Sequence, residues 1–283
     1  MTLTVFIAVI GAAILHASWN AMVKGGADKY VGMGAVALGH VPFALVGVMF
    51  VPSPDPASYP YLATGILLHV GYQIFLLQSY RVGDLTQVNP IARGSAPLIV
   101  AFVSVALLGV TLAPLELFAI GIIGLGILSL SLTRKSDGQR NGKAAIFALT
   151  TGCFIASYSL VDGIGARLAG TSLGFFGWLA IGNGIIVVAF LRLRHPGTLT
   201  NIVRHGRKMF FIGGGASFVA YAMVTWAFTQ APIALVTALR ETSIIFALLI
   251  GVFFLKEKLN LTKLLSTFVT LVGAALLRFA RSA

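Results

Sequence analysis

Two arginines lie inside long apolar runs of the sequence, where charged side chains are rare. Arg93 falls in the run 86–109 and Arg240 in the run 233–254, each about seven residues, or roughly 10 Å of helix, from the start of its run. A charge at that depth in a membrane helix costs several kcal/mol and is a functional hypothesis by default. Guanidinium groups bind carboxylates and phosphates through paired hydrogen bonds, so the two arginines predict binding of an acidic group.

Each arginine also has a local interpretation, in which it pairs with a neighbouring group and serves structure alone. In a continuous helix Glu241 is a poor partner for Arg240, because residues i and i+1 do not face each other. Glu241 and Asp162 also lie in apolar runs and are the candidates for binding an amine.

Polar and aromatic side chains recur in four further runs, in three of them at helical spacing. His16, Trp19 and Asn20 share one face of a helix, because residues i, i+3 and i+4 are neighbours on its surface. The corresponding sets in two other runs are His69, Tyr72 and Gln73, and Tyr158 and Asp162; the run 208–230 adds Tyr221 and Trp226. If these faces converge, they form a cavity with aromatic walls and amide groups.

Each of these residues also has an ordinary structural interpretation. A single aromatic residue serves helix packing or an interfacial belt more often than a ligand, and the histidines can make structural hydrogen bonds. Proton coupling through His16, His69, Asp162 or Glu241 is a further hypothesis.

Pro90 and Pro97 flank Arg93 in its run. Proline removes a backbone donor and kinks a helix, which predicts a hinge or broken helix here, or merely a bent one. Gly121, Gly124 and Gly126, with the glycines at 213–215, are interpreted as surfaces for close helix packing.

The elements that carry these residues are ten apolar runs. The chain has 283 residues, of which 58% are hydrophobic and 10% charged, and its mean hydropathy of +0.95 excludes a soluble fold. The runs show no alternation of the kind that barrel strands need, so the fold class is an all-α integral membrane bundle. Its predicted transmembrane helices span 3–23, 30–51, 58–80, 86–109, 115–132, 143–162, 172–192, 208–230, 233–254 and 261–280.

The net charge of +12 indicates topology rather than nucleic-acid binding, because the basic residues are scattered at helix ends. The odd-numbered loops carry about fifteen Lys and Arg, and the even-numbered loops with the termini about three. This bias predicts cytoplasmic odd loops and both termini outside.

The chain contains weak internal similarity. Ala17-Ser18-Trp19 matches Ala156-Ser157-Tyr158, and the segment 88–93 around Arg93 runs parallel to 235–240 around Arg240. The second offset is longer, which predicts an insertion in the basic loop 195–208. Each of the two halves, 1–138 and 139–283, has five helices. Because five is an odd number, the two halves must enter the membrane from opposite sides. Inverted repeats of this kind are the architecture of alternating access.

With these features the sequence resembles the EamA-like branch of the drug/metabolite transporter superfamily over nearly its whole length. The resemblance is carried by His16-Ala-Ser-Trp-Asn20-Ala-Met-Val-Lys24 and by two copies of a helix, a short loop and a Gly-bearing helix, at 96–130 and 244–277. Phe254-Leu-Lys-Glu257-Lys-Leu is similar to the family's Gly-Glu loop, with Lys256 in place of glycine, and the first copy lacks the glutamate. The resemblance implies a central cavity lined by the first, third, fourth, sixth, eighth and ninth helices. It also implies cytoplasmic termini, against the charge bias.

The predicted function is secondary transport of a small anionic or zwitterionic metabolite, such as an amino acid, organic acid or phosphonate. The expected location is a bacterial-type inner (plasma) membrane. The alternatives are an exporter of aromatic or amphipathic compounds and a non-transporting membrane interaction protein. An enzyme is not expected, because hydrolase, zinc and phosphate-loop motifs do not occur in the sequence. With a lone Cys153, no metal or cofactor is predicted; the expected partners are a small-molecule substrate and lipid, with a monomer or homodimer as the assembly.

Overall fold

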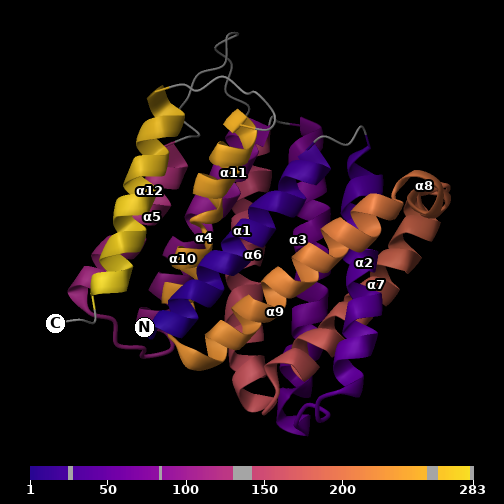
Figure 1. Cartoon of the computed structure of the whole chain (residues 1–283), viewed down its shortest axis with the longest axis horizontal. Helices are drawn as coiled ribbons and strands as arrows, with labels where there is room; N and C mark the ends of the chain where they lie inside the picture. Colours follow the sequence, from indigo (N-terminus) through magenta and orange to yellow (C-terminus); the bar gives the residue numbers. More distant parts are fainter. Residues whose placement is uncertain (25–27, 83–84, 130–141, 254–260, 281–283) are drawn as a thin grey trace.

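The computed structural model describes residues 1–24, 28–82, 85–129, 142–253 and 261–280, and every regular element in these ranges is helical. Figure 1 shows the helices lying side by side in one bundle. In chain order they are α1 (Leu3–Lys24), α2 (Lys29–Met49), η1 (Pro56–Ser58), α3 (Tyr59–Val82), α4 (Leu85–Ala106), α5 (Pro114–Ser129), α6 (Gly142–Leu168), α7 (Ser172–Arg194), α8 (Thr198–His205), η3 (Met209–Gly213, a π-helix), α9 (Gly214–Gln230), α10 (Ile233–Arg240), α11 (Ser243–Phe253) and α12 (Leu261–Phe279).

The all-α, multi-span fold class is confirmed. Within the described ranges, eight segments are long and apolar enough to cross a membrane, and two shorter apolar helices end at Ser129 and Phe279. These ten segments coincide with the ten predicted runs, although the two short ones leave the count of ten spans a prediction. Side chains begin several helices by accepting hydrogen bonds from free backbone N–H groups: Asp28 caps α2, and Thr171 caps α7.

One predicted boundary was wrong, and one predicted loop contains a helix. The sixth helix, expected to end at 162, continues to Leu168, because Gly163 and Gly165 are packed inside it rather than ending it. It ends before Gly170, whose φ of +68° is a conformation that glycine adopts readily. The basic loop after α7 contains the additional helix α8, whose Ile202 is buried against α2 and α7.

The predicted ninth helix is interrupted. α10 ends at Arg240 and α11 begins at Ser243, although this stretch contains neither proline nor glycine. The turn is held by short-range bonds, in which the N–H groups of Ile244 and Ile245 donate to the carbonyls of Glu241 and Thr242. The hydroxyl of Thr242 also donates to the Leu239 carbonyl at 2.8 Å, a local bond that competes with the helical pattern.

The prolines of α4 do not break their helix. α4 continues through Pro90 and Pro97 from Leu85 to Ala106, so a broken helix at this place is not observed. A hinge at these prolines stays a prediction about motion.

Glycines set the closest helix crossings. Gly39 of α2 lies against Gly214 of α9, and a Cβ at Gly39 would lie 2.9 Å from the Gly214 Cα and overlap the Phe210 carbonyl. Gly124 and Gly126 of α5 are packed in the same way, whereas a Cβ at Gly121 would meet no described atom within 4 Å. The close-packing interpretation therefore holds for Gly124 and Gly126 and was wrong for Gly121.

Replacing Gly39 by Ala should lower the free energy of unfolding by about 1–3 kcal/mol, because the added methyl group overpacks the crossing. The measurement is the apparent Tm of detergent-purified protein. Gly121→Ala is the matched control and should leave Tm unchanged or slightly higher, since alanine is the better helix former. Equal losses of Tm in both variants would contradict this account of the crossing.

Candidate functional site

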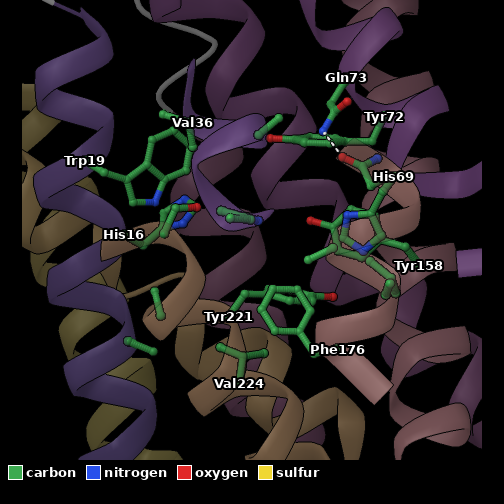
Figure 2. A pocket seen from close by; sticks show the side chains of 18 of the residues that line it. His16, Trp19, Val36, His69, Tyr72, Gln73, Tyr158, Phe176, Tyr221 and Val224 are labelled. Atoms are coloured by element: carbon green, nitrogen blue, oxygen red, sulfur yellow. Dashed lines mark hydrogen bonds between the residues drawn. The ribbon is translucent and has the colours of Figure 1, made fainter. Parts of the chain in front are cut away.

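A cavity of about 100 Å³ lies between α1, α2, α3, α6, α7, α9 and α10. Its volume is enough for several water molecules. Figure 2 shows His16 and Trp19 of α1 on one side of it and His69, Tyr72 and Gln73 of α3 on the other. Tyr158, Phe176 and Tyr221 complete an aromatic wall.

Eight of the predicted site residues line this cavity: His16, Trp19, His69, Tyr72, Gln73, Tyr158, Tyr221 and Arg240. Helical spacing had placed six of them on common helix faces, and their role in binding stays a prediction. α4 contributes no residue to the lining, whereas α2 and α7 do, which differs from the helix set that the family resemblance implied.

Five predicted residues lie elsewhere. The Asn20 amide donates to the His16 carbonyl of its own helix at 2.8 Å. Trp226 lines a separate pocket beside Arg167. Arg93, Glu241 and Asp162 lie behind the lining residues and contact them or one another.

Glu241 joins the two arginines that the sequence singled out. Its Oε2 accepts a hydrogen bond from Arg93 Nε at 2.7 Å, and its Oε1 lies 3.5 Å from Arg240 Nε. The i, i+1 argument against an Arg240–Glu241 pair was wrong, because the helix ends between these residues. Arg93 also donates to the Ser243 hydroxyl at 2.7 Å. One glutamate between two arginines leaves one net positive charge, and Arg240 is the member that reaches the cavity.

A second polar network joins α3, α6 and α9. Asp162 is fully buried, and its Oδ2 lies 2.8 Å from His69 Nε2 and accepts from the Tyr221 hydroxyl at 2.6 Å. The His69 ring stacks on Tyr158 with their centroids 4.2 Å apart. Asp162 Oδ1 has no hydrogen-bond partner among the described residues, and it faces Gly65, where a Cβ would lie 2.6 Å away.

Sequence reasoning missed three polar residues of the wall, His40 of α2, Asn183 of α7 and Ser217 of α9. Ser217 shares the face of Tyr221, four residues further on. His40 and Asn183 have no polar residue at i+3 or i+4, so no face was recognised. Their occurrence inside apolar spans was the available signal. Asn183 accepts a hydrogen bond from Gln73 at 3.1 Å, drawn in Figure 2.

Four lining residues carry a buried side-chain nitrogen without a hydrogen-bond partner in the described part of the chain: Trp19 Nε1, His40 Nε2, Asn183 Nδ2 and Arg240 Nε. Three of these are obligate donors. Buried donors without partners cost free energy, which a bound group rich in acceptor oxygens would recover. Across the described ranges, no group of three His, Cys, Asp or Glu that could hold a metal ion is found.

The cavity has a neighbouring pocket toward one end of the bundle. A smaller pocket shares Met33, Ala37 and Gln73 with it and continues to Tyr30 and Phe190, near the basic loops. Along α7 in the opposite direction, the cavity is followed by a packed cluster that includes Phe175, Phe176, Leu179 and Phe218, and then by the pocket at Thr171 and Arg167.

Comparison with known proteins identifies the second half of this bundle. Residues 142–279 match the model of the EamA-like transporter family. This half of the chain belongs to that family. The EamA match confirms the family resemblance over these residues and indicates a membrane transporter of the drug/metabolite type, with a small-molecule substrate and a lipid environment.

The fold of the whole chain has a solved counterpart. A structure described only as "Crystal structure of protein" is similar over 100% of this chain and 99% of its own, with a TM-score of 0.76 and 14% identity. At that identity the likeness concerns the fold alone. The curated proteins contain no match. The loop similar to the family's Gly-Glu motif, residues 254–259, lies outside the described residues.

Proposed function

We propose that this protein is a secondary transporter that moves a small anionic or zwitterionic metabolite across a bacterial-type inner membrane by alternating access. The observation that carries the proposal is Arg240. Among the described residues it is the one Arg, Lys, Asp or Glu on the cavity wall, and it belongs to a cluster with one net positive charge.

Arg240 would bind the acidic group of the substrate. Its Nε lies within ion-pair distance of Glu241 but makes no hydrogen bond in the described structure, so this donor is available to a carboxylate or phosphonate. The donors of Trp19 and Asn183 favour the same kind of ligand. Arg93 would act through Glu241, by holding the carboxylate that orients Arg240.

The proposed mechanism uses two inverted repeats, residues 1–138 and 139–283, whose boundary lies outside the described residues. The packing of the helices supports this mechanism, because helix pairs between the two halves have counterparts when the halves are interchanged. If α6, α7, α9, α11 and α12 correspond in order to α1–α5, the packing of α1 on α9 is matched by α6 on α3, and that of α4 on α6 by α11 on α1. The equivalents α2 and α7 pack together, as do α5 and α12. Halves that exchange these contacts can open a central site to each side in turn.

One-sided access favours the same cycle. The central cavity shares lining residues with a pocket that lies toward the basic loops, and the Phe176–Phe218 cluster lies between the cavity and the other end. With the basic loops in the cytoplasm, this arrangement corresponds to a state closed to the outside, and the termini lie on the outer side.

A thermal-shift screen of purified protein tests the substrate class. Acetate, succinate, L-alanine, methylphosphonate and methanesulfonate are compared with phenyltrimethylammonium, an aromatic cation. A solute at a hundred times its Kd should stabilise the folded state by about 2.7 kcal/mol and raise Tm by roughly 5–10 °C. Stabilisation by at least one anion or zwitterion supports the proposal, and stabilisation by the cation alone overturns it.

A second candidate is an exporter of aromatic or amphipathic compounds. The aromatic wall formed by Trp19, Tyr72, Tyr158, Phe176 and Tyr221 favours it, because such rings bind apolar and cationic surfaces. In this case Arg240 would serve structure, and the screen would select phenyltrimethylammonium.

A further inference from the structure

The network of His69, Asp162 and Tyr221 joins three helices at the cavity wall and has no role in the anion site described above. Both of its outer members, His69 and Tyr221, line the cavity. Its central member, Asp162, is fully buried. A buried carboxylate that serves structure alone is normally satisfied at both oxygens, whereas Asp162 Oδ1 has no partner in the described part of the chain.

From this geometry we propose that the His69–Asp162 pair binds one proton from the cavity and that this proton promotes binding of the anionic substrate. The inference rests on the proposed anion site at Arg240 and adds the coupling ion to it.

The position of His69 gives the proton its path. The side chain of His69 is 14% exposed, and that of Asp162 is 0% exposed, so exchange with the cavity takes place at the imidazole. With the proton bound, imidazolium and carboxylate face each other at 2.8 Å and their charges cancel. When the imidazole releases the proton to water in the cavity, the pair keeps one negative charge on Asp162, held by the His69 Nε2–H and Tyr221 O–H donors.

The charge of the pair acts on the anion through the shared cavity. A neutral pair leaves the one net positive charge of the Arg93–Glu241–Arg240 cluster in place, which favours an anion. The negative charge of the deprotonated pair repels the anion. Reciprocity requires that an anion which binds better to the protonated form also raises proton occupancy. Proton and anion would therefore enter and leave the site together.

The surrounding titratable and charged side chains are few. They are His16 of α1, His40 of α2, Tyr72 of α3, Arg93 of α4, Tyr158 of α6, Tyr221 of α9, Arg240 of α10 and Glu241 of the following turn, whereas α7 presents Asn183. Glu241 is already paired with Arg93 at 2.7 Å. His16 and His40 have no carboxylate within ion-pair distance in the described structure, so His69 is the histidine placed for exchange with an acid.

The first test needs no substrate. Full-length protein with isotope-labelled histidine is titrated from pH 5 to 9 in nanodiscs, and His69 is assigned among the five histidines through His69→Gln. We expect the His69 ring to change protonation state in this range. In Asp162→Asn this transition should change, because the imidazole loses the carboxylate that lies 2.8 Å from its Nε2. His195→Gln, which alters a ring at the end of α7, is the control and should leave the His69 transition in place.

The second test measures the linkage, with methanesulfonate as the probe because its charge is constant over this range. Its apparent Kd should be at least about fivefold weaker at pH 8.5 than at pH 5.5, and Asp162→Asn should reduce this ratio to near one. A His69 ring that keeps one protonation state in the wild type, or titrates identically in Asp162→Asn, overturns the proton site but leaves the anion site intact. Absence of binding by every anion overturns the proposed function and the coupling, whereas the histidine titration still reports separately on the proton site.

Discussion

Replacing Glu241 by Gln should destabilise the folded protein by about 3–5 kcal/mol, the range typical for removing one partner of a buried ion pair. The side chain is 1% exposed and lies between the guanidinium groups of Arg93 and Arg240. The amide would leave two positive charges in the same apolar region without a counter-charge. The apparent Tm of detergent-purified protein should fall by roughly 10 °C.

A double-mutant cycle separates this charge effect from a loss of packing. Arg93→Gln alone leaves Glu241 with Arg240, and Arg93→Gln combined with Glu241→Gln removes one charge of each sign. The double variant should be more stable than Glu241→Gln alone, with a coupling energy of at least about 1 kcal/mol. If the stability losses of the two single variants simply add in the double variant, the result would contradict an ion pair between Arg93 and Glu241.

Replacing Arg240 by Gln should weaken binding of the anion selected in the thermal-shift screen by at least about 30-fold, equivalent to 2 kcal/mol. The change removes the charge at the cavity wall but leaves Glu241 paired with Arg93, so folded protein should be retained. Arg240→Lys keeps the positive charge but lacks the paired donors, so its affinity for the anion should lie between those of the wild type and Arg240→Gln. Isothermal titration of the purified variants gives the Kd values.

Arg167→Gln is the matched control for this prediction. Arg167 also lies in a membrane-spanning helix, but its guanidinium donates to the carbonyls of Phe228 and Ala231, both at 2.8 Å, away from the cavity. Affinity should be unchanged in this variant. If both arginine variants lose affinity equally, the effect of Arg240 is not a contact with the anion.

Most of the bundle could be predicted from the sequence because the bilayer imposes a length on each apolar run. The inward faces of α1 and α3 were also predictable, since His16 and Trp19, or His69 and Tyr72, recur at helical spacing. Convergence of these faces was an expectation from pattern alone, and eight of the thirteen predicted residues do line one cavity.

The interruption at Glu241 could not be predicted, because it depends on tertiary contacts rather than on a helix-breaking residue. The Arg93 guanidinium donates to the Ser243 hydroxyl of a different span at 2.7 Å, and no local sequence pattern predicts that hydrogen bond. Pro90 and Pro97 were the obvious candidates for a break, yet α4 continues through both. His40 and Asn183 were missed for a related reason, since a single polar residue in a span does not define a face.

Solute counterflow in proteoliposomes tests the central claim, that a small anion crosses the membrane through the cavity at Arg240. The solute selected in the screen is loaded inside, and entry of the labelled solute is measured for the wild type and for Ala220→Leu, which adds three carbon atoms to the wall of a cavity of about 100 Å³. Ala220 is buried on α9, and retention of fold is checked by Tm. We predict exchange by the wild type and at least about tenfold slower exchange by folded Ala220→Leu. Exchange at the same rate in both, or absence of exchange by a wild type that binds the solute, would contradict the account.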